Sequence, residues 1–416
     1  MLAWELPRLG WDVEVLTPRA SEVRQDVVER DAGAFFAPDV RVHEVGSIGR
    51  PLLEALGSRS HGWRTLQSMH RRGSALIASK RFDLIYFSTT TFVYFVLGAA
   101  WKRRYGVPYL VDFHDPWVKR NGAADPPQGW RSQGWRSRLT QYMADRMERA
   151  AVTNAEGLVA VSPDYVALLR RRYQMSNPVW LATGRHAVIP FGALDHDLSE
   201  AARATRTTTA RSSAELNVHY VGAGGAIMVR SFTLICRALA LLRSQGNQLV
   251  TRVRVRLFGT VYDWKPGDAK QLEGVARAAG LADLVTECPQ RVSYRRSLEI
   301  LMESDGALIL GVDDSGYMPS KLFSYALSGK PLLTALRRDS PAYAQLQHAP
   351  GLGHALWFDS HEEMPVSEAA TLVTCFMDDV AARKTYDRRA ALTPFLAPAM
   401  AMRHAELFAA CLPPNQ

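Results

Sequence analysis

The chain has 416 residues, which is long enough for two or three domains. Its composition, 47% apolar and 22% charged, excludes a disordered or fibrous protein. Fifty Lys and Arg against 41 Asp and Glu predict an anionic partner. The excess lies in the first half, because residues 51–150 carry 16 basic and 7 acidic side chains. The four cysteines show neither metal-ligand spacing nor the pattern of a disulfide framework, which favours a reducing, cytoplasmic setting.

Short runs rich in β-branched residues alternate with helix-length segments along the whole chain. In the first half the expected strands are Val13–Thr17, Val40–Val45, Asp83–Ser88, Pro108–Phe113, Gly157–Ser162 and His186–Phe191. In the second half they are Asn217–Val221, Val253–Phe258, Leu284–Glu287, Ala307–Gly311, Pro331–Ala335 and Ala355–Phe358. This alternation predicts an α/β protein with two doubly wound domains, whose parallel sheets are covered by helices on both faces.

Composition also suggests where the domains end. Residues 195–215 include a polar, low-complexity stretch without an apolar period, so we expect a linker between a first domain, 1–194, and a second, 216–384. Residues 385–416 are expected to form a C-terminal helix that packs back on the first domain. The longest apolar run, Phe92–Trp101, is about half of the ~20 residues that a membrane span needs, and the first 20 residues lack the pattern of a signal peptide.

The start of the chain departs from the usual plan of a doubly wound domain, which opens with a strand, a Gly-rich turn and a helix. Here Met1–Gly10 has the pattern of the end of a helix and precedes the strand Val13–Thr17. We expect that the true start codon lies upstream, since a sheet without its central strand would leave backbone groups unpaired. A truncated protein is the alternative.

Two stretches of the second half have features of an anion site. Gly222, Gly224 and Gly225 follow a strand and precede a helix, so this turn allows close backbone approach to a phosphate, and Arg230 lies just beyond it. A helix expected to begin near Ser320 would offer the N–H groups of Lys321 and Leu322 to a diphosphate. The alternatives are an ordinary turn, a serine cap and solvated cations.

One histidine of the first half lies where open α/β sheets bind ligands. His114 directly follows the strand Pro108–Phe113, at its carboxyl end, and Asp115 follows it. Asp115 is placed to orient the imidazole ring or an acceptor hydroxyl. A lone histidine is more often structural, but the sequence His-Asp-Pro-Trp at a strand end favours a site.

Five segments occur in a characteristic order: Gly10–Pro18, Val111–Trp117, Val188–Gly192, Tyr220–Gly225 and Pro319–Pro331. Together they resemble the family 4 glycosyltransferases, which are retaining enzymes that move a sugar from a nucleotide diphosphate to an acceptor. The resemblance implies the GT-B fold, two Rossmann-like domains facing across a cleft, with the acceptor on the first and the nucleotide sugar on the second. It also implies that His114 acts against the donor sugar, and it implies no metal and no cofactor besides the donor substrate.

The resemblance fails at two acidic positions. The family carries two glutamates separated by seven residues, one near the transferred sugar and one on the ribose, where this chain has Gly316 and Ser324. Asp313 and Asp314 lie just before Gly316 and are candidates to substitute for the lost carboxylates, although loop acids are more often solvated. Ala223 likewise replaces an arginine of the family's diphosphate clamp, which leaves Arg230 as the candidate cation.

Aromatic and basic residues are interleaved over 117–138, where Trp117, Lys119, Arg120, Trp130 and Arg131 are examples. Such a mixture suits the surface of an anionic membrane, and we expect no nucleic acid. The alternative is a solvated loop whose Trp residues cover the core.

Three functions therefore remain. The first is a retaining glycosyltransferase for a bacterial surface polysaccharide or glycolipid, located in the cytoplasm or at the inner face of the cell membrane, with a lipid-linked or saccharide acceptor. The second is a non-catalytic GT-B-like binding or scaffold protein, or an inactive homologue, which the lost glutamates would explain. The third is a nucleotide-sugar epimerase of the same architecture.

Overall fold

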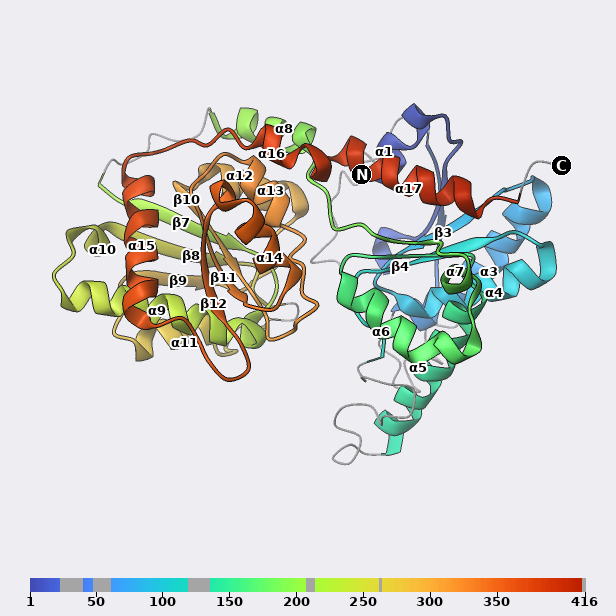
Figure 1. The fold of residues 1–416 in the computed structure, drawn as a ribbon, viewed down its shortest axis with the longest axis horizontal. Coiled ribbons are helices and arrows are strands. Elements are labelled where there is room, and N and C mark those ends of the chain that lie inside the picture. Colours follow the sequence, from blue (N-terminus) through green and yellow to red (C-terminus); the bar gives the residue numbers. More distant parts are fainter. Residues whose placement is uncertain (23–39, 48–60, 119–134, 207–213, 262–263, 414–416) are drawn as a thin grey trace. The chain divides into compact units, whose positions relative to one another are not determined.

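The computed structural model describes the chain except for residues 23–39, 48–60, 119–134, 207–213, 262–263 and 414–416 (Figure 1). The chain divides into two compact units. Unit 1 comprises Met1–Pro190 and Pro398–Gln416, and unit 2 comprises Phe191–Ala397. Every strand expected from the sequence is present, with ends displaced by at most three residues. The α/β class and the parallel sheets are therefore confirmed.

Unit 1 contains two parallel sheets. The strands β1 (Glu14–Pro18) and β2 (Arg41–Val45) pair with each other. The second sheet has the order β3 (Ile85–Ser88), β4 (Tyr109–Phe113), β5 (Gly157–Ala160) and β6 (His186–Val188). In the described part of the chain, no strand pairs with both β1 and β3. The expectation of a further strand ahead of Met1 stays a prediction.

Helices surround these strands in unit 1. They are α1 (Leu2–Glu5), η1 (Pro7–Leu9), η2 (Ala20–Glu22), α3 (His61–Ser79), η4 (Phe92–Tyr94), α4 (Phe95–Tyr105), α5 (Trp135–Asn154), α6 (Pro163–Tyr173), η5 (Gln174–Ser176), α7 (Val179–Ala182) and α17 (Ala397–Cys411). All five residues of β4 are buried. A central parallel strand covered on both faces needs such a continuous buried run.

Unit 2 is built on one parallel sheet with the order β12-β11-β10-β7-β8-β9. These strands are β7 (Leu216–Val221), β8 (Val253–Phe258), β9 (Val285–Cys288), β10 (Gly306–Leu310), β11 (Leu332–Arg337) and β12 (His354–Phe358). The chain starts in the middle at β7, moves outward to β9, and then crosses to β10 on the other side of β7. The direction of winding therefore reverses between β7 and β10, as in other doubly wound sheets.

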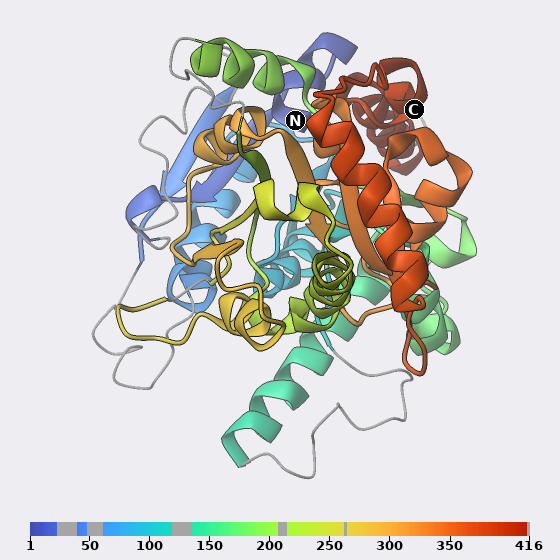
Figure 2. The same cartoon turned by 90° about the vertical axis from the view of Figure 1, so that its left-hand side faces the viewer.

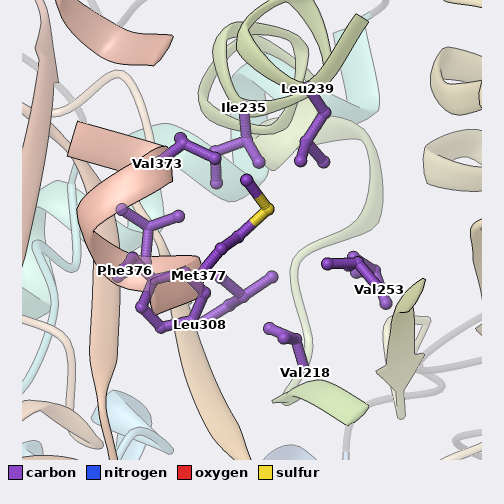
Figure 3. Close-up of a pocket in the computed structure, with 10 residues that line it drawn as sticks. Val218, Ile235, Leu239, Val253, Leu308, Val373, Phe376 and Met377 are labelled. Carbon is purple, nitrogen blue, oxygen red and sulfur yellow. The ribbon is translucent and has the colours of Figure 1, made fainter. Parts of the chain in front are cut away.

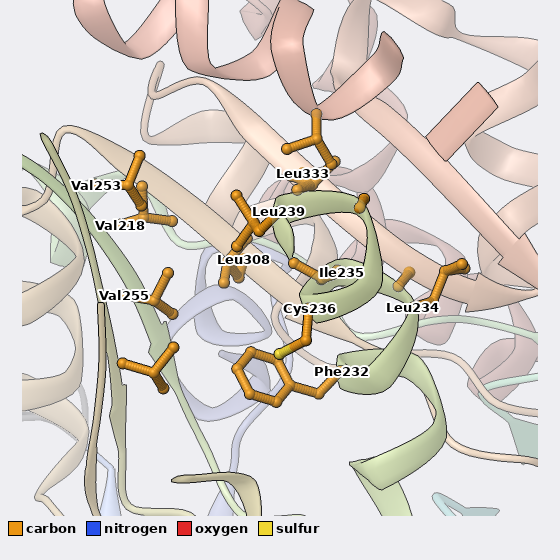
Figure 4. Packing of buried hydrophobic residues seen from close by; sticks show 14 of the residues in the cluster. Val218, Phe232, Leu234, Ile235, Cys236, Leu239, Val253, Val255, Leu308 and Leu333 are labelled. Carbon is orange, nitrogen blue, oxygen red and sulfur yellow. The ribbon is translucent and has the colours of Figure 1, made fainter. Parts of the chain in front are cut away.

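The helices of unit 2 are α8 (Asp195–Arg206), η6 (Gly225–Met228), α9 (Val229–Ser244), α10 (Gln248–Arg252), α11 (Gln271–Ala278), α12 (Tyr294–Glu303), α13 (Leu322–Leu327), α14 (Pro341–His348), η7 (Pro350–Leu352), α15 (Val366–Ala381), α16 (Arg389–Leu392) and η8 (Thr393–Phe395). Figure 2 turns the same cartoon by 90°. The main apolar cluster joins α9, α11 and α15 to the sheet (Figure 4). It leaves a residual cavity of only about 10 Å³ beside Ile235, Val373 and Met377, so this face is a close-packed core without room for a ligand (Figure 3).

One stretch of unit 2, Gly225–Ser244, is long and apolar enough to cross a membrane by length and composition. Half of it is buried, and Phe232, Ile235 and Leu239 belong to the core. This is the usual position of a core helix in a globular domain, which passes the same test.

Two expectations about the domain boundaries are wrong. The first part of the expected linker, Asp195–Arg206, is the helix α8, because Leu198, Ala201 and Thr205 recur at helical spacing and become buried, with α8 packed on α12. Aspartates in its first turn suit the positive end of a helix. The expected C-terminal helix over 385–416 is also shorter, since residues up to Ala397 belong to unit 2 and α17 alone returns to unit 1.

Candidate functional site

The reversal point of the sheet in unit 2 brings two functional loops together. The turn after β7 begins at Gly222, and the loop after β10 runs from Gly311 to Lys321. These loops leave the carboxyl ends of neighbouring strands in opposite directions, which creates the crevice where open α/β sheets bind ligands. Two stretches that the sequence assigned to a diphosphate therefore lie at the same edge of the sheet.

The glycine turn lets the side chain of Lys321 come close to the backbone, but two of its N–H groups are not available to a ligand. The N–H of Gly222 donates to the carbonyl of Phe258 at 2.8 Å, and that of Gly224 donates to the carbonyl of Thr260 at 3.0 Å. These two donors are thus already used. A Cβ atom on Gly222 would lie only 1.9 Å from Nζ of Lys321, so glycine is needed there to admit the lysine.

Lys321 is the central cation of this edge. Its side chain is half-buried between Gly222 and the ring of Tyr220, whose centroid lies 5.5 Å from Nζ. Burial, together with the positive charge of Arg291, lowers the pKa of Lys321 to about 8. Within the described residues, Lys321 has no carboxylate partner. A cation in this condition gains from an anionic ligand, which would compensate both the burial and the repulsion.

Arg291 is a residue of this edge that the sequence analysis missed. It lies just beyond β9, and its Nη1 donates to the carbonyl of Gly259, directly after β8, at 2.9 Å. The loops that follow β7, β8 and β9 thus contribute to one cationic edge. The sequence does contain a signal for Arg291, which is a basic residue shortly after an expected strand. The same pattern is typical of an ordinary surface arginine, so it does not identify a binding residue.

Tyr325, also missed, holds the lysine loop against the glycine turn. Its hydroxyl donates to the carbonyl of Val221 at 3.1 Å and accepts from the N–H of Val221 at 3.2 Å. Burial raises the pKa of Tyr325, so the hydroxyl stays neutral and can make both bonds. A side chain of α13 is in this way fixed to the last residue of β7, directly before Gly222.

The helix expected to begin near Ser320 is present, but its first residue lies two positions later. The helix α13 begins at Leu322 with Lys321 as its cap, and it has only six residues. Ser320 is exposed and makes no capping bond, whereas the N–H of Leu322 donates to the carbonyl of Pro319 at 3.1 Å and its side chain is buried. Ser324 is half-buried on the same helix. Because Pro319 forms a tight turn, the helix starts two residues later than the sequence pattern indicates.

The structure pairs two residues that the sequence assigned to different parts of the donor. Nη1 of Arg230 lies 3.2 Å from Oδ2 of Asp313, and Arg337 forms an ion pair with the other oxygen of the same carboxylate. Asp313 therefore neutralises Arg230 instead of standing alone on the sugar side. Asp314 accepts the N–H of Gly316 at 2.8 Å, which shapes the loop.

Unit 1 carries a second polar cluster around His114, at the carboxyl end of β4. Nε2 of His114 lies 2.9 Å from Oδ2 of Asp112 and 3.3 Å from the hydroxyl of Ser88. The same Oδ2 accepts the hydroxyl of Tyr86 at 2.6 Å and that of Ser88 at 3.2 Å. One buried carboxylate thus orients the imidazole ring. Asp115, the other predicted catalytic residue, is exposed.

Electrostatics favour the charged form of this histidine. Burial lowers the pKa of His114, but the hydrogen bond and charge of Asp112, together with Asp115, outweigh burial and raise the pKa above its usual value. Burial and the Asp112 carboxylate raise the pKa of Tyr86 well above its usual range, so Tyr86 remains a hydrogen-bond donor. Asp112 was missed, although an acid inside an apolar strand is a readable signal of a partnered carboxylate.

The comparisons with known proteins agree with this architecture. Residues 1–192 match the family described as the glycosyl transferase 4-like domain. A glycosyltransferase from Rickettsia africae is similar over 96% of this chain and 98% of its own, with 9% identity and a TM-score of 0.56. Anabaena HepE, solved in complex with UDP, is similar over 96% and 100%, with 14% identity and a TM-score of 0.54. The UDP-forming trehalose-phosphate synthase of Burkholderia vietnamiensis is similar over 95% and 100%, with 13% identity and a TM-score of 0.54.

The two parallel-sheet units and these structural neighbours show the GT-B fold. The match of residues 1–192 identifies a glycosyl transferase 4-like domain in this part of the chain, in agreement with the resemblance found in the sequence. The comparison with curated proteins gives no match.

Proposed function

We propose that the chain is a retaining glycosyltransferase that moves a sugar from a nucleotide diphosphate to a lipid-linked or saccharide acceptor. The observation that carries this proposal is Lys321, a half-buried cation without a carboxylate partner in the described residues, placed against Gly222 at the reversal point of the sheet. A diphosphate is the anion that such a site suits. One structural neighbour is UDP-forming by name and another was solved in complex with UDP, which supports a nucleotide sugar as donor.

The proposed chemistry needs charge stabilisation more than a strong base. The breaking bond between the sugar and the diphosphate leaves negative charge on the phosphate oxygens, and Lys321 with Arg291 would stabilise that charge in a partly desolvated site. No metal or other cofactor is part of the proposal, because protein cations supply the compensation. His114, oriented by Asp112, would hold the transferred sugar through a hydrogen bond.

We further propose that the acceptor belongs to bacterial surface polysaccharide or glycolipid synthesis. The chain would then work in the cytoplasm, at the inner face of the membrane. The support is the excess of basic residues over 51–150, which lies in unit 1 and suits anionic lipid.

The test is transfer from a panel of nucleotide sugars, with the anomeric configuration of the product read by NMR. Wild-type protein is expected to release the nucleotide diphosphate and to form a product with the donor's configuration. The double variant His114→Ala/Lys321→Ala should lose activity by at least about a hundredfold, as expected for lost charge stabilisation. Lys265→Ala, an exposed lysine of unit 2, is the matched control and should behave as wild type. Full activity in the double variant would refute this site.

Binding without turnover is the second candidate. The observation in its favour is the ion-paired state of Asp313, which lies near the position where the family's sugar-side glutamate is replaced by Gly316. Calorimetric UDP binding together with no transfer or hydrolysis from any donor of the panel would establish this alternative.

A further inference from the structure

The first half of α5 presents large apolar side chains to solvent. Leu139, Tyr142 and Met143 are 50%, 52% and 43% exposed. Their spacing of three and four residues puts them on one face of the helix. Figures 1 and 2 both show this part of α5 projecting away from the sheet of unit 1. The three side chains thus form an exposed apolar stripe on this part of α5.

The second half of α5 has a different role, because it is fixed in the core. Ala151 and Val152 are buried. The hydroxyl of Tyr109 donates to the carbonyl of Ala151 at 2.6 Å, and Nε1 of Trp180 donates to that of Val152 at 3.0 Å. These contacts anchor the helix, so the exposed stripe is not needed to hold α5 in place.

The exposed charges in the described part of this face are basic. Arg146 continues the face toward the core, whereas Arg149 lies at its edge with its guanidinium over the ring of Tyr173, and both are exposed. Asp145, the acid beside Arg149, is half-buried. Nη1 of Arg146 donates to the hydroxyl of Tyr142 at 3.3 Å, which joins the basic part to the apolar part. The acid Glu148 points to the other side of the helix, where it is buried against Arg172 and Tyr173. We call Leu139, Tyr142, Met143, Arg146 and Arg149 the apolar-basic face.

We propose that the apolar-basic face docks the chain on an anionic lipid bilayer, a step that rests on the lipid-linked acceptor of the proposed function. Apolar and tyrosine side chains would enter the headgroup boundary, while the two arginines would pair with lipid phosphates. A second copy of the chain is the alternative occupant, and the experiment distinguishes it from a bilayer.

The experiment is co-sedimentation of the full chain with vesicles of phosphatidylcholine, either pure or with about 30% phosphatidylglycerol to supply the negative surface potential. Wild-type protein should bind the anionic vesicles but not the neutral ones. Its binding to the anionic vesicles should weaken in high salt. The variant Leu139→Gln/Tyr142→Gln/Met143→Gln should bind at least about tenfold more weakly, as the loss of three inserted side chains implies. Arg146→Gln/Arg149→Gln should lower the affinity for anionic vesicles as well.

The control is Met175→Gln, because Met175 is a 93% exposed apolar side chain of unit 1 that does not belong to α5, and the variant should bind as wild type. UDP binding by calorimetry, measured on every variant, checks the fold and separates the two proposals. Vesicle binding without UDP binding would refute the proposed function and leave the membrane face standing. Equal binding of the triple variant and wild type would overturn the membrane face. The membrane face would also be overturned if wild-type protein is a dimer that does not bind vesicles and the triple variant is a monomer.

Discussion

His114 of unit 1 and Lys321 of unit 2 occupy comparable places, near the carboxyl edge of a parallel sheet, but their electrostatic surroundings are opposite. Asp112 stabilises the charged form of His114, whereas burial and Arg291 destabilise the charged form of Lys321. A cation that already has its carboxylate is suited to hold a fixed orientation. A cation without one is suited to receive an anion from outside, which supports the proposal that His114 positions the sugar and that Lys321 binds the diphosphate.

Removing the charge of Lys321 should have the largest effect. For Lys321→Met we expect UDP to bind about a hundredfold more weakly, because charge-assisted hydrogen bonds contribute about 1.5–3 kcal/mol each. The free energy of unfolding at neutral pH should rise by about 1 kcal/mol, since a poorly compensated cation is replaced by an apolar side chain of similar length. Calorimetry and urea unfolding measure the two quantities.

Lys265→Met controls for the general loss of a positive charge in unit 2, and it should change neither quantity. Gly222→Ala tests position instead of charge, because its Cβ would displace Nζ of Lys321. It should weaken UDP binding while Lys321 keeps its charge. If both Lys321→Met and Gly222→Ala bind UDP as tightly as wild type, Lys321 does not bind the diphosphate.

The second expected effect is the pH dependence of UDP binding. The free protein holds Lys321 at a pKa of about 8, so above that pH the lysine must take up a proton when the anion binds. Affinity should therefore fall as pH rises above about 8, by up to tenfold per pH unit. Titration calorimetry at several pH values measures this. Lys321→Arg, which stays protonated, should show a flat profile, and a flat profile in wild type would contradict the assignment.

The smallest expected effect concerns Asp112. In Asp112→Asn the pKa of His114 should fall, because the carboxylate that stabilises the imidazolium is gone. The basic limb of the pH profile of kcat/KM should move to lower pH, with UDP affinity unchanged. The ion pair's contribution to stability is present at acidic pH and is lost as pH rises through the raised pKa of His114. Asp115→Asn is the control and should lower the pKa of His114 less than Asp112→Asn does. If the basic limb of the kcat/KM profile moves equally in both variants, Asp112 is not the orienting residue.

Local pattern carried the sequence analysis a long way. The buried run of β4 and the alternation around it were sufficient for the fold class, and local pattern assigned both the glycine turn at Gly222 and the stretch at Lys321 to a diphosphate. Pairings across long sequence distances were not readable, as with Arg230 and Asp313, because they depend on how loops from different strands meet. Arg291 and Tyr325 were missed for the same reason. The helix α8 was missed because its small, polar residues hide a narrow buried face.

The last helix, α17, lies against the polar cluster of unit 1. Phe408 packs on Trp11 and Tyr86, with ring centroids 5.7 and 4.9 Å apart, and His404 contacts Tyr86 as well. Gly157, at the start of β5, leaves room for Cys411, whose Sγ would lie 2.7 Å from a Cβ there. Tyr86 in turn donates to Asp112. During synthesis the ribosome must therefore translate all of unit 2 before unit 1 can close around His114, so the site made from the earliest strands is among the last parts of the chain to be completed.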